Sequence, residues 1–409
     1  MSFLNFIKTE RGKKVGVATI FAGVSAMFCF MAYEFMRSSS ESVFLSFFPA
    51  SSKVYALTLT PVFLFLIIYF YGFLLSKFGS KKTMLIYFAF VFISIISLYF
   101  LTLKKIAWAG FGLLIFKEGY IVVLSEIYWS YINSILKQDE ARILNGPMAG
   151  LGALGSLIGG YFVSSFAVRL TTKSLILYSS FLLFPSLLFL YYAYNISGEP
   201  KPADDEKGGK KGHLHLSIFV ENKTVMLLAV VVFIAQIVST LGDINFTYYV
   251  QQYISDVDLR TAYLGGFWQK VNIISFTMQF LITPIVLRKF KVKYVLVLIP
   301  LLHIMTSLYS FIHPSLFSAS LVLMIFKSMD YSIYRASKEI IYIPFSYDTR
   351  YRAKQFVDAF TYRFSKGFTS LILSLMNILS YNFIPLTIPL IAAFSGLWSY
   401  MASRFKIEE

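Results

Sequence analysis

Ionisable side chains interrupt several apolar segments of this 409-residue chain, at spacings that would align them on helical faces. Glu34, Arg37 and Glu41 lie three and four residues apart and would share one face of a helix. Lys117 and Glu118 are neighbours in a later apolar segment. An ionised group in the middle of a bilayer costs about 2.5–3.5 kcal/mol, so such groups face protein or a water-filled cavity. A cavity lined by Arg and Lys would attract an anion, and nearby carboxylates would hold these cations or exchange protons.

Charged and polar residues recur in the apolar segments of the second half, where Asp243 follows Gln236 by two helical turns. The cations that we predict to bind substrate charge are Arg37, Lys117, Lys270 and Lys354. The acidic residues that we predict to orient them or to exchange protons are Glu34, Glu118, Glu126, Asp243 and Asp358. Aromatic residues near these charges that could stack on a flat ring include Trp129, Phe246, Tyr248, Trp268 and Tyr362. The alternative is that the charges form structural ion pairs between helices and have no further role.

The elements that must position these residues are about twelve apolar stretches, each long enough to span a bilayer. They cover roughly residues 14–36, 54–78, 83–103, 107–134, 147–168, 173–195, 224–250, 262–287, 293–313, 315–334, 354–380 and 383–403. The third, sixth, ninth and twelfth contain stretches of about 19–20 residues without Asp, Glu, Lys or Arg. A period of three indicates that two helices of each triplet line a cavity while the third faces lipid. This arrangement is typical of a two-lobed secondary transporter with twelve helices.

Composition supports a polytopic, all-α membrane protein. Apolar residues make up 57% and charged residues only 14% of the chain, against about a quarter charged in soluble domains. Twelve spans with short loops leave no room for a soluble catalytic domain, so we expect no enzyme activity and no cofactor. Cys29 is the single cysteine, which rules out an internal disulfide. The four His residues show no metal-ligand spacing, so we expect no metal site.

The net charge of +16 reflects membrane topology, and we expect no nucleic-acid partner. Basic residues concentrate in alternate loops, as at Lys77, Lys81 and Lys82, which predicts that both termini are cytoplasmic. The loops predicted outside hold little beyond Lys53, Lys104, Lys105, Arg169, Lys173 and Arg260. The first apolar segment lacks a small-residue cleavage site and is therefore interpreted as a retained helix.

A polar interval after the sixth span divides the chain into two halves. We predict an N-terminal six-helix lobe over 1–196, a cytoplasmic linker over 197–222 and a C-terminal six-helix lobe over 223–409. The fifth span is rich in glycine, from Gly150 through Gly155 to Gly160. These glycines lie within an apolar span, so we interpret them as helix-packing positions rather than as a phosphate-binding loop.

The residues between the tenth and eleventh spans carry the most specific pattern. The run from Asp330 to Pro344 contains Ser337-Lys338-Glu339 and Tyr342-Ile343-Pro344, and it is followed by Lys354 and Val357-Asp358. This pattern resembles the ATP/ADP translocase family of intracellular bacteria and plastids, in which a TKE-x-x-YIP motif precedes K-x-x-VD. The resemblance implies a major-facilitator-like nucleotide exchanger that binds phosphates with basic residues. It implies site roles for Arg37, Asp243, Lys354 and Asp358, and a structural loop at Lys338 and Glu339.

Two departures from the family bear on the substrate. Ser38, Ser39 and Ser40 follow Arg37 where the family has an Asp and then a Lys. In the seventh span, Asp243 stands where the family has a Glu, and Thr247 where it has a Lys. Loss of two cavity lysines would suit a less charged substrate than a triphosphate. We therefore expect a secondary-active importer or exchanger of nucleotides or a related phosphorylated metabolite, acting as a monomer with a counter-substrate or a proton. We place it in a bacterial cytoplasmic membrane. The alternatives are a carrier of another organic solute and a non-transporting membrane sensor or scaffold.

Overall fold

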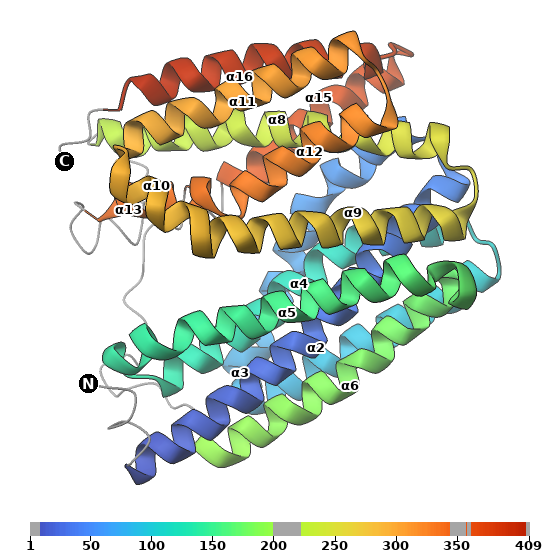
Figure 1. The fold of residues 1–409 in the computed structure, drawn as a ribbon. Helices are drawn as coiled ribbons and strands as arrows, with labels where there is room; N and C mark the ends of the chain where they lie inside the picture. Colours follow the sequence, from blue (N-terminus) through green and yellow to red (C-terminus); the bar gives the residue numbers. More distant parts are fainter. Residues whose placement is uncertain (1–8, 199–221, 344–356, 358–360, 406–409) are drawn as a thin grey trace. The chain divides into compact units, whose positions relative to one another are not determined.

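The computed structural model describes residues 9–198, 222–343, 357 and 361–405, and this part of the chain contains helices but no β-strand. The expected all-α class is therefore confirmed. The helices of the first half and of the start of the second are α2 (Glu10–Phe47), α3 (Lys53–Leu103), α4 (Trp108–Ile135), α5 (Gln138–Leu170), α6 (Thr172–Ser197) and α8 (Lys223–Tyr253). The remaining ones are α9 (Val257–Thr277), α10 (Thr283–Lys289), α11 (Val292–Ile312), α12 (Leu316–Asp330), α13 (Ile333–Tyr342), α15 (Tyr362–Ile378) and α16 (Thr387–Ser403) (Figure 1).

Within the described residues, nine helical segments are long and apolar enough to cross a membrane. One of them runs from Ala50 to Leu103 and contains two of the predicted spans. Helix α4, with its three charged residues, is not among the nine, and α15 has only 17 residues. The described residues of the twelve predicted ranges are nevertheless mostly helical, although the tenth range, 315–334, crosses the turn at Tyr331 and Ser332 between α12 and α13.

Helix α3 changes direction at Gly79, inside the basic turn between the second and third predicted spans. Gly79 has φ 75° and ψ 174°, a backbone conformation that residues with a Cβ rarely adopt. The surrounding residues Lys77, Lys81 and Lys82 supply the charge of this turn. The turn expected from sequence is therefore present, although the helix continues on both sides of it without a loop.

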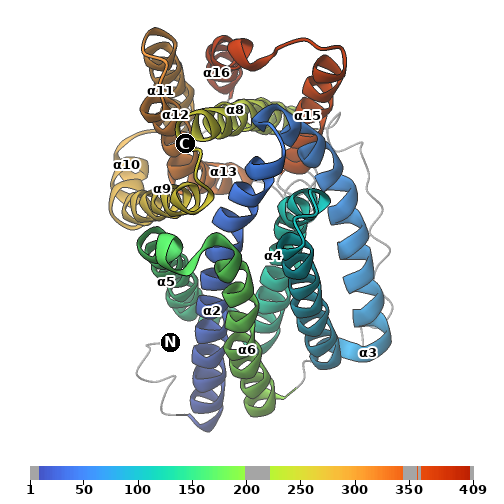
Figure 2. The same cartoon turned by 90° about the vertical axis from the view of Figure 1, so that its right-hand side faces the viewer.

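Two compact units make up the structure, and unit 1 comprises residues 1–47, 62–210 and 256–269. Helix α2 is its central helix and packs against α4, α5 and α6 (Figure 2). Its buried face carries small residues, Ala18, Ala22 and Ala26, which let neighbouring helices approach closely. This face is part of an apolar core that also includes Val91 and Leu113.

The packing of α5 against α2 depends on glycine. A Cβ at Gly155 would lie 2.1 Å from the backbone oxygen of Met27, and one at Gly159 would lie 2.9 Å from that of Met31. Distances this short show that the two backbones are in direct contact at these turns. The interpretation of the glycine-rich span as a helix-packing face is confirmed at these two positions.

Unit 2 comprises residues 48–61, 211–255 and 270–409, and α8 is its central helix. Helix α8 packs against α12, α15 and α16, and 78% of the residues in its most apolar stretch are buried. Its core residues include Val232, Ala235 and Leu241, with Trp398 of α16 buried in the same cluster. The first helix after the predicted linker thus takes the same central role in unit 2 that α2 has in unit 1.

The two units do not follow the predicted halves at two segments. Residues 48–61, which include the start of α3, belong to unit 2, and residues 256–269, which include most of α9, belong to unit 1. Hydrogen bonds fix both segments: Gln251 accepts from the Ala50 amide, and Asp258 accepts from the Thr172 amide. The residues of the predicted linker, apart from 197, 198 and 222, lie outside the described part, and the lobe boundaries remain a prediction.

Candidate functional site

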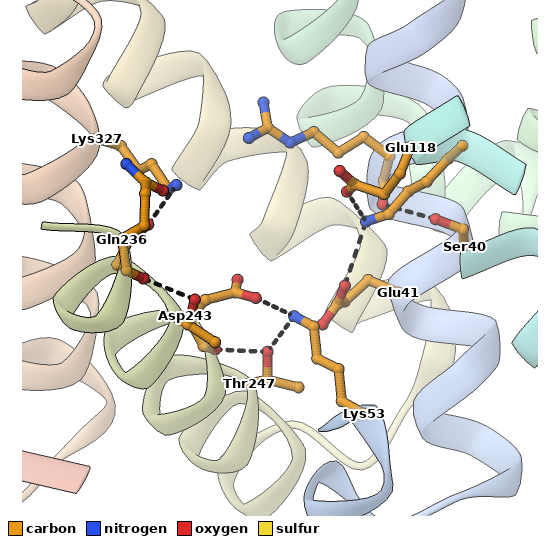
Figure 3. Close-up of polar contacts among 12 residues, drawn as sticks. Ser40, Glu41, Lys53, Glu118, Gln236, Asp243, Thr247 and Lys327 are labelled. Atoms are coloured by element: carbon orange, nitrogen blue, oxygen red, sulfur yellow. Dashed lines mark hydrogen bonds and ion pairs between the residues drawn. The ribbon is translucent and has the colours of Figure 1, made fainter. Parts of the chain in front are cut away.

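A cluster of charged side chains lies between α2 and α4 in unit 1. Glu34 and Arg37 form an ion pair within α2, with 3.7 Å between Oε1 and NH1. One turn further on, Glu41 Oε2 lies 3.4 Å from Lys117 Nζ on α4 (Figure 3). Lys117 is also 3.9 Å from Glu118, so its ammonium lies between two carboxylates. The predicted shared face of Glu34, Arg37 and Glu41 is present, and α4 supplies a partner for it.

Arg37 is held by a tryptophan as well as by Glu34. Its guanidinium carbon lies 3.1 Å from the centre of the Trp268 ring, a stacked cation–π contact, and 5.7 Å from the centre of the Tyr33 ring. Trp268 is 7% exposed and belongs to the part of α9 that packs in unit 1. One face of this tryptophan is therefore occupied by Arg37.

A second charged cluster lies in unit 2, where Lys53 at the start of α3 meets α8. Lys53 Nζ lies 2.9 Å from Asp243 Oδ2 and donates a 2.8 Å hydrogen bond to Thr247 Oγ1 (Figure 3). The Lys53 side chain is 4% exposed and that of Asp243 is 19% exposed. Asp243 and Thr247 lie one helical turn apart, so α8 presents both oxygen atoms on one face.

The polar face of α8 also includes Ser239 and Gln236, which lie one and two helical turns before Asp243. Lys327 of α12 donates a 2.8 Å hydrogen bond to Ser239 Oγ. Gln236 lies one turn before Ser239 and is 1% exposed. Asn245, on another face of α8, accepts a hydrogen bond from Thr387 of α16. Helix α8 therefore gathers several of the polar groups of unit 2.

The other predicted residues do not join these clusters. Glu126 is exposed and accepts a 2.8 Å hydrogen bond from Ser130 within α4. Lys270 is exposed on α9. Lys354 and Asp358 lie outside the described residues, so their predicted roles remain predictions.

The expected structural loop at Lys338 and Glu339 is wrong, because both residues lie on helix α13. Lys338 is 8% exposed, and its ammonium lies 5.3 Å from the centre of the Tyr334 ring. Lys338 follows Tyr334 by four residues, which places both on one face of the helix. The physical reason for the error is that polar residues after an apolar span are also typical of loops. The alternation of buried and exposed residues that marks α13 as a helix depends on which of its neighbours cover it.

Sequence reasoning missed the role of Lys53 and assigned this residue to an outside loop. That assignment is wrong, because Lys53 is the first residue of α3 and its ammonium is bound to Asp243 and Thr247. A positive charge at a helix N-terminus is repelled by the positive end of the helix dipole. The position of Lys53 next to a predicted helix start could therefore have indicated that a carboxylate binds it. Lys327 of α12, within the tenth predicted span, was not assigned to a site from the sequence either.

Comparison with known families gives one match. Residues 316–400, about a fifth of the chain, match the family model described as TLC ATP/ADP transporter. The match runs from α12 through α13 and α15 into α16 and includes the Lys338–Glu339 motif. It confirms the predicted resemblance to this family over that stretch. Among curated proteins, none matches the chain.

Several solved transporter structures share the fold over nearly the whole chain. A single-residue mutant of the nucleoside transporter NupG has a TM-score of 0.72 at 13% identity, covering 94% of this chain and 98% of that one. A D-xylose-proton symporter gives 0.67 at 14% identity, covering 96% and 98%. The inward-open xylose transporter XylE from E. coli gives 0.65 at 15% identity, covering 97% of both chains. The predicted major-facilitator-like fold is therefore confirmed, and the chain is an integral, multi-pass membrane protein.

Proposed function

We propose that this protein is a secondary-active transporter of nucleotides or related organic phosphates that works by alternating access. The observation that carries the proposal is the match of residues 316–400 to an ATP/ADP transporter family within a chain of transporter fold. Alternating access in such transporters uses two lobes that move against each other around binding groups near the bilayer midplane. The substrate class follows from the family match and from the basic residues of the apolar helices.

The charged clusters support transport over a purely structural role. Isolated pairs between helices would need one carboxylate for each cation, whereas Lys117 lies between Glu41 and Glu118. In such a cluster, one carboxylate can take up a proton, or an anionic substrate can replace one carboxylate beside the lysine. We place the coupling function on Glu34, Glu118 and Asp243, which lie next to cations in the structure.

Arg37 and Lys117 are the cations of unit 1 that we assign to the substrate. Arg37 is stacked on Trp268 and paired with Glu34; in this proposal phosphate oxygens take the place of Glu34 and accept hydrogen bonds from the edge of the guanidinium plane. Lys354, Lys270 and Asp358 complete the proposed set, on the basis of the family resemblance for Lys354 and Asp358 and of sequence position for Lys270.

Uptake of labelled ATP, ADP and other nucleotides into cells or proteoliposomes containing the protein tests the function directly. We expect saturable uptake that excess unlabelled nucleotide abolishes, and loss of this uptake in Arg37→Gln with normal membrane insertion. Lys104→Gln is the matched control, because Lys104 is exposed after the end of α3 and the substitution removes the same charge.

Other outcomes would identify other functions. Saturable uptake of a solute that is insensitive to nucleotides would establish a carrier of another class. Binding of nucleotide without flux would establish a sensor or scaffold. Two liposome preparations separate exchange from proton coupling. Uptake that requires nucleotide inside the liposomes indicates exchange. Uptake that a pH gradient drives into liposomes without internal nucleotide indicates proton coupling. We further propose that the protein acts as a monomer in a bacterial cytoplasmic membrane.

A further inference from the structure

Lys327 is a cation of α12 whose surroundings in the structure are largely neutral. Its ammonium donates to Ser239 Oγ at 2.8 Å and lies 5.5 and 6.0 Å from the ring centres of Phe326 and Tyr331. In the described part of the chain, no carboxylate lies within ion-pair distance of Lys327. A hydroxyl group does not neutralise an ammonium, and an ionised lysine in a membrane helix is costly unless an anion or water accompanies it.

Two acidic residues, Asp243 and Asp330, bear on the charge of Lys327. Asp243 is within electrostatic range of Lys327, but its carboxylate is bound at 2.9 Å by Lys53. Asp330 follows Lys327 by three residues on α12, and the two side chains do not form an ion pair. Lys53 and Asp243 cancel each other's charge, whereas Lys327 and Lys366 of α15 are two further cations within electrostatic range of Asp243, so positive charge remains on this side of α8.

Gln236 provides a second donor at the same place. Its amide nitrogen Nε2 is buried and has no hydrogen-bond partner among the described residues, while the side chain is 1% exposed. A buried donor without a partner destabilises the folded protein, so such a group indicates a ligand or water that accepts from it. Gln236 and Ser239 are one turn apart on α8, and Figure 3 shows Gln236 and Lys327 together on this side of the helix.

We infer that Lys327, Gln236 and Ser239 form an oxyanion subsite that binds a phosphoryl group of the transported substrate. Lysine provides a compact charge with three rotatable donors, which suits a phosphate. The Gln236 amide donates a further hydrogen bond, and the Ser239 hydroxyl holds the ammonium in place. This inference rests on the proposed function for the identity of the substrate, and on the geometry of α8 and α12 alone for the binding of an oxyanion.

Binding of inorganic pyrophosphate tests the subsite without transport. The thermal unfolding midpoint of the purified protein is measured with sodium pyrophosphate and with sodium chloride at equal ionic strength. We expect pyrophosphate to raise the midpoint by several degrees, through preferential binding to the folded state, in the wild-type protein and in Lys289→Gln. Lys289 is an exposed lysine at the end of α10, so this control removes the same charge. Lys327→Gln should lose the rise, and Lys327→Arg should keep part of it.

Gln236→Glu gives an independent variant in case Lys327→Gln does not fold. The new carboxylate has the shape of the amide and would pair with Lys327, so the protein should remain folded while the pyrophosphate effect disappears. The inference is overturned when wild-type protein shows no specific rise, or when Lys327→Gln or Gln236→Glu retains it. A rise of equal size with succinate would replace the phosphoryl assignment by a general dicarboxylate site.

Transport by the same variants separates this inference from the proposed function. In Lys327→Gln, we expect KM for a nucleotide to increase at least tenfold, while uptake of any nucleoside that the wild-type protein accepts changes less than twofold. Equal losses for both substrates would show a structural role for Lys327 and would overturn the subsite. Pyrophosphate binding through Lys327, together with no uptake of any organic phosphate, would refute the proposed function and leave the subsite in place.

Discussion

The contact between Lys53 and Asp243 joins the start of α3 to the middle of α8 inside an apolar environment. Both side chains are largely buried, and Thr247 accepts a further hydrogen bond from the ammonium. A buried ion pair contributes little net stability compared with apolar residues, but removal of one partner leaves an uncompensated charge. The pair therefore fixes which turn of α8 faces the start of α3.

Substitutions at this pair should be strongly non-additive. Lys53→Gln or Asp243→Asn alone should each destabilise the protein by about 3–5 kcal/mol, because the remaining charge is buried without its partner. The double variant should be more stable than either single variant, since two amides can hydrogen-bond to each other. Thermal unfolding of the purified protein measures this. Additive losses would show that the two residues act independently.

The stack between Arg37 and Trp268 leads to a prediction about substrate affinity. A desolvated cation–π contact contributes about 2 kcal/mol, and here it orients the guanidinium. We expect Trp268→Leu to raise KM for the anionic substrate about tenfold with a smaller change in kcat, and Trp268→Phe to have a weaker effect.

Trp108→Leu is the control for this experiment, because Trp108 is 73% exposed at the start of α4. An unchanged KM in Trp268→Leu would contradict the proposed orientation of Arg37. Equal losses of activity in the Leu and Phe variants would point to packing rather than to the ring face.

At the scale of elements, helix contacts in unit 1 depend on the absence of side chains at defined turns. The spacing of Gly155 and Gly159 puts both on the face of α5 that contacts α2, where a Cβ would meet backbone atoms rather than flexible side chains. The spacing of small residues was visible in the sequence. Which glycines make the contact was not, because Gly150 is of the same residue type, yet a Cβ added to it would meet no neighbouring atom within 4 Å.

Gly155→Ala should destabilise the protein, because the added methyl group would lie 2.1 Å from Met27 O and would force the two helices apart. Overpacking of this kind costs about 1–3 kcal/mol. Gly150→Ala is the matched control, and it should leave stability unchanged or raise it by up to about 1 kcal/mol, since alanine favours the helix. The yield of monodisperse protein and the unfolding midpoint report the difference. Equal behaviour of the two variants would show that α5 can move away from α2 at no cost.

At the scale of the whole molecule, the distribution of basic residues predicts which ends of the helices face the cytoplasm. The single cysteine, Cys29, is buried, so a Cys29→Ser background allows new cysteines to report on accessibility. In this background, Lys82→Cys should react with a membrane-impermeant thiol reagent only after the cells are opened, and Lys104→Cys should react in intact cells. The opposite pattern would invert the proposed topology, with both termini outside. Both lysines are exposed, which makes their replacement mild.

Much of the fold could be predicted because membrane spans are set by local properties. A stretch of about 20 apolar residues must become a helix in lipid, where every backbone group needs an internal hydrogen bond. Most described residues of the predicted ranges are therefore helical, and the i, i+3 pairing of Glu34 with Arg37 follows from the same local geometry. The division into two compact units was less predictable, because segments 48–61 and 256–269 pack according to contacts distant in sequence.

The amino-acid order alone determined the class of protein, the helices, the resemblance to a transporter family and the set of intramembrane charges. Only the tertiary structure decided which partner each lysine meets: Lys117 meets Glu41, Lys53 meets Asp243, and Lys327 meets the neutral hydroxyl of Ser239. The physical reason is that hydropathy and helical spacing act within one segment. The pairing of charges, by contrast, depends on the rotation and height of each helix against its neighbours, which the packing of the whole apolar surface sets.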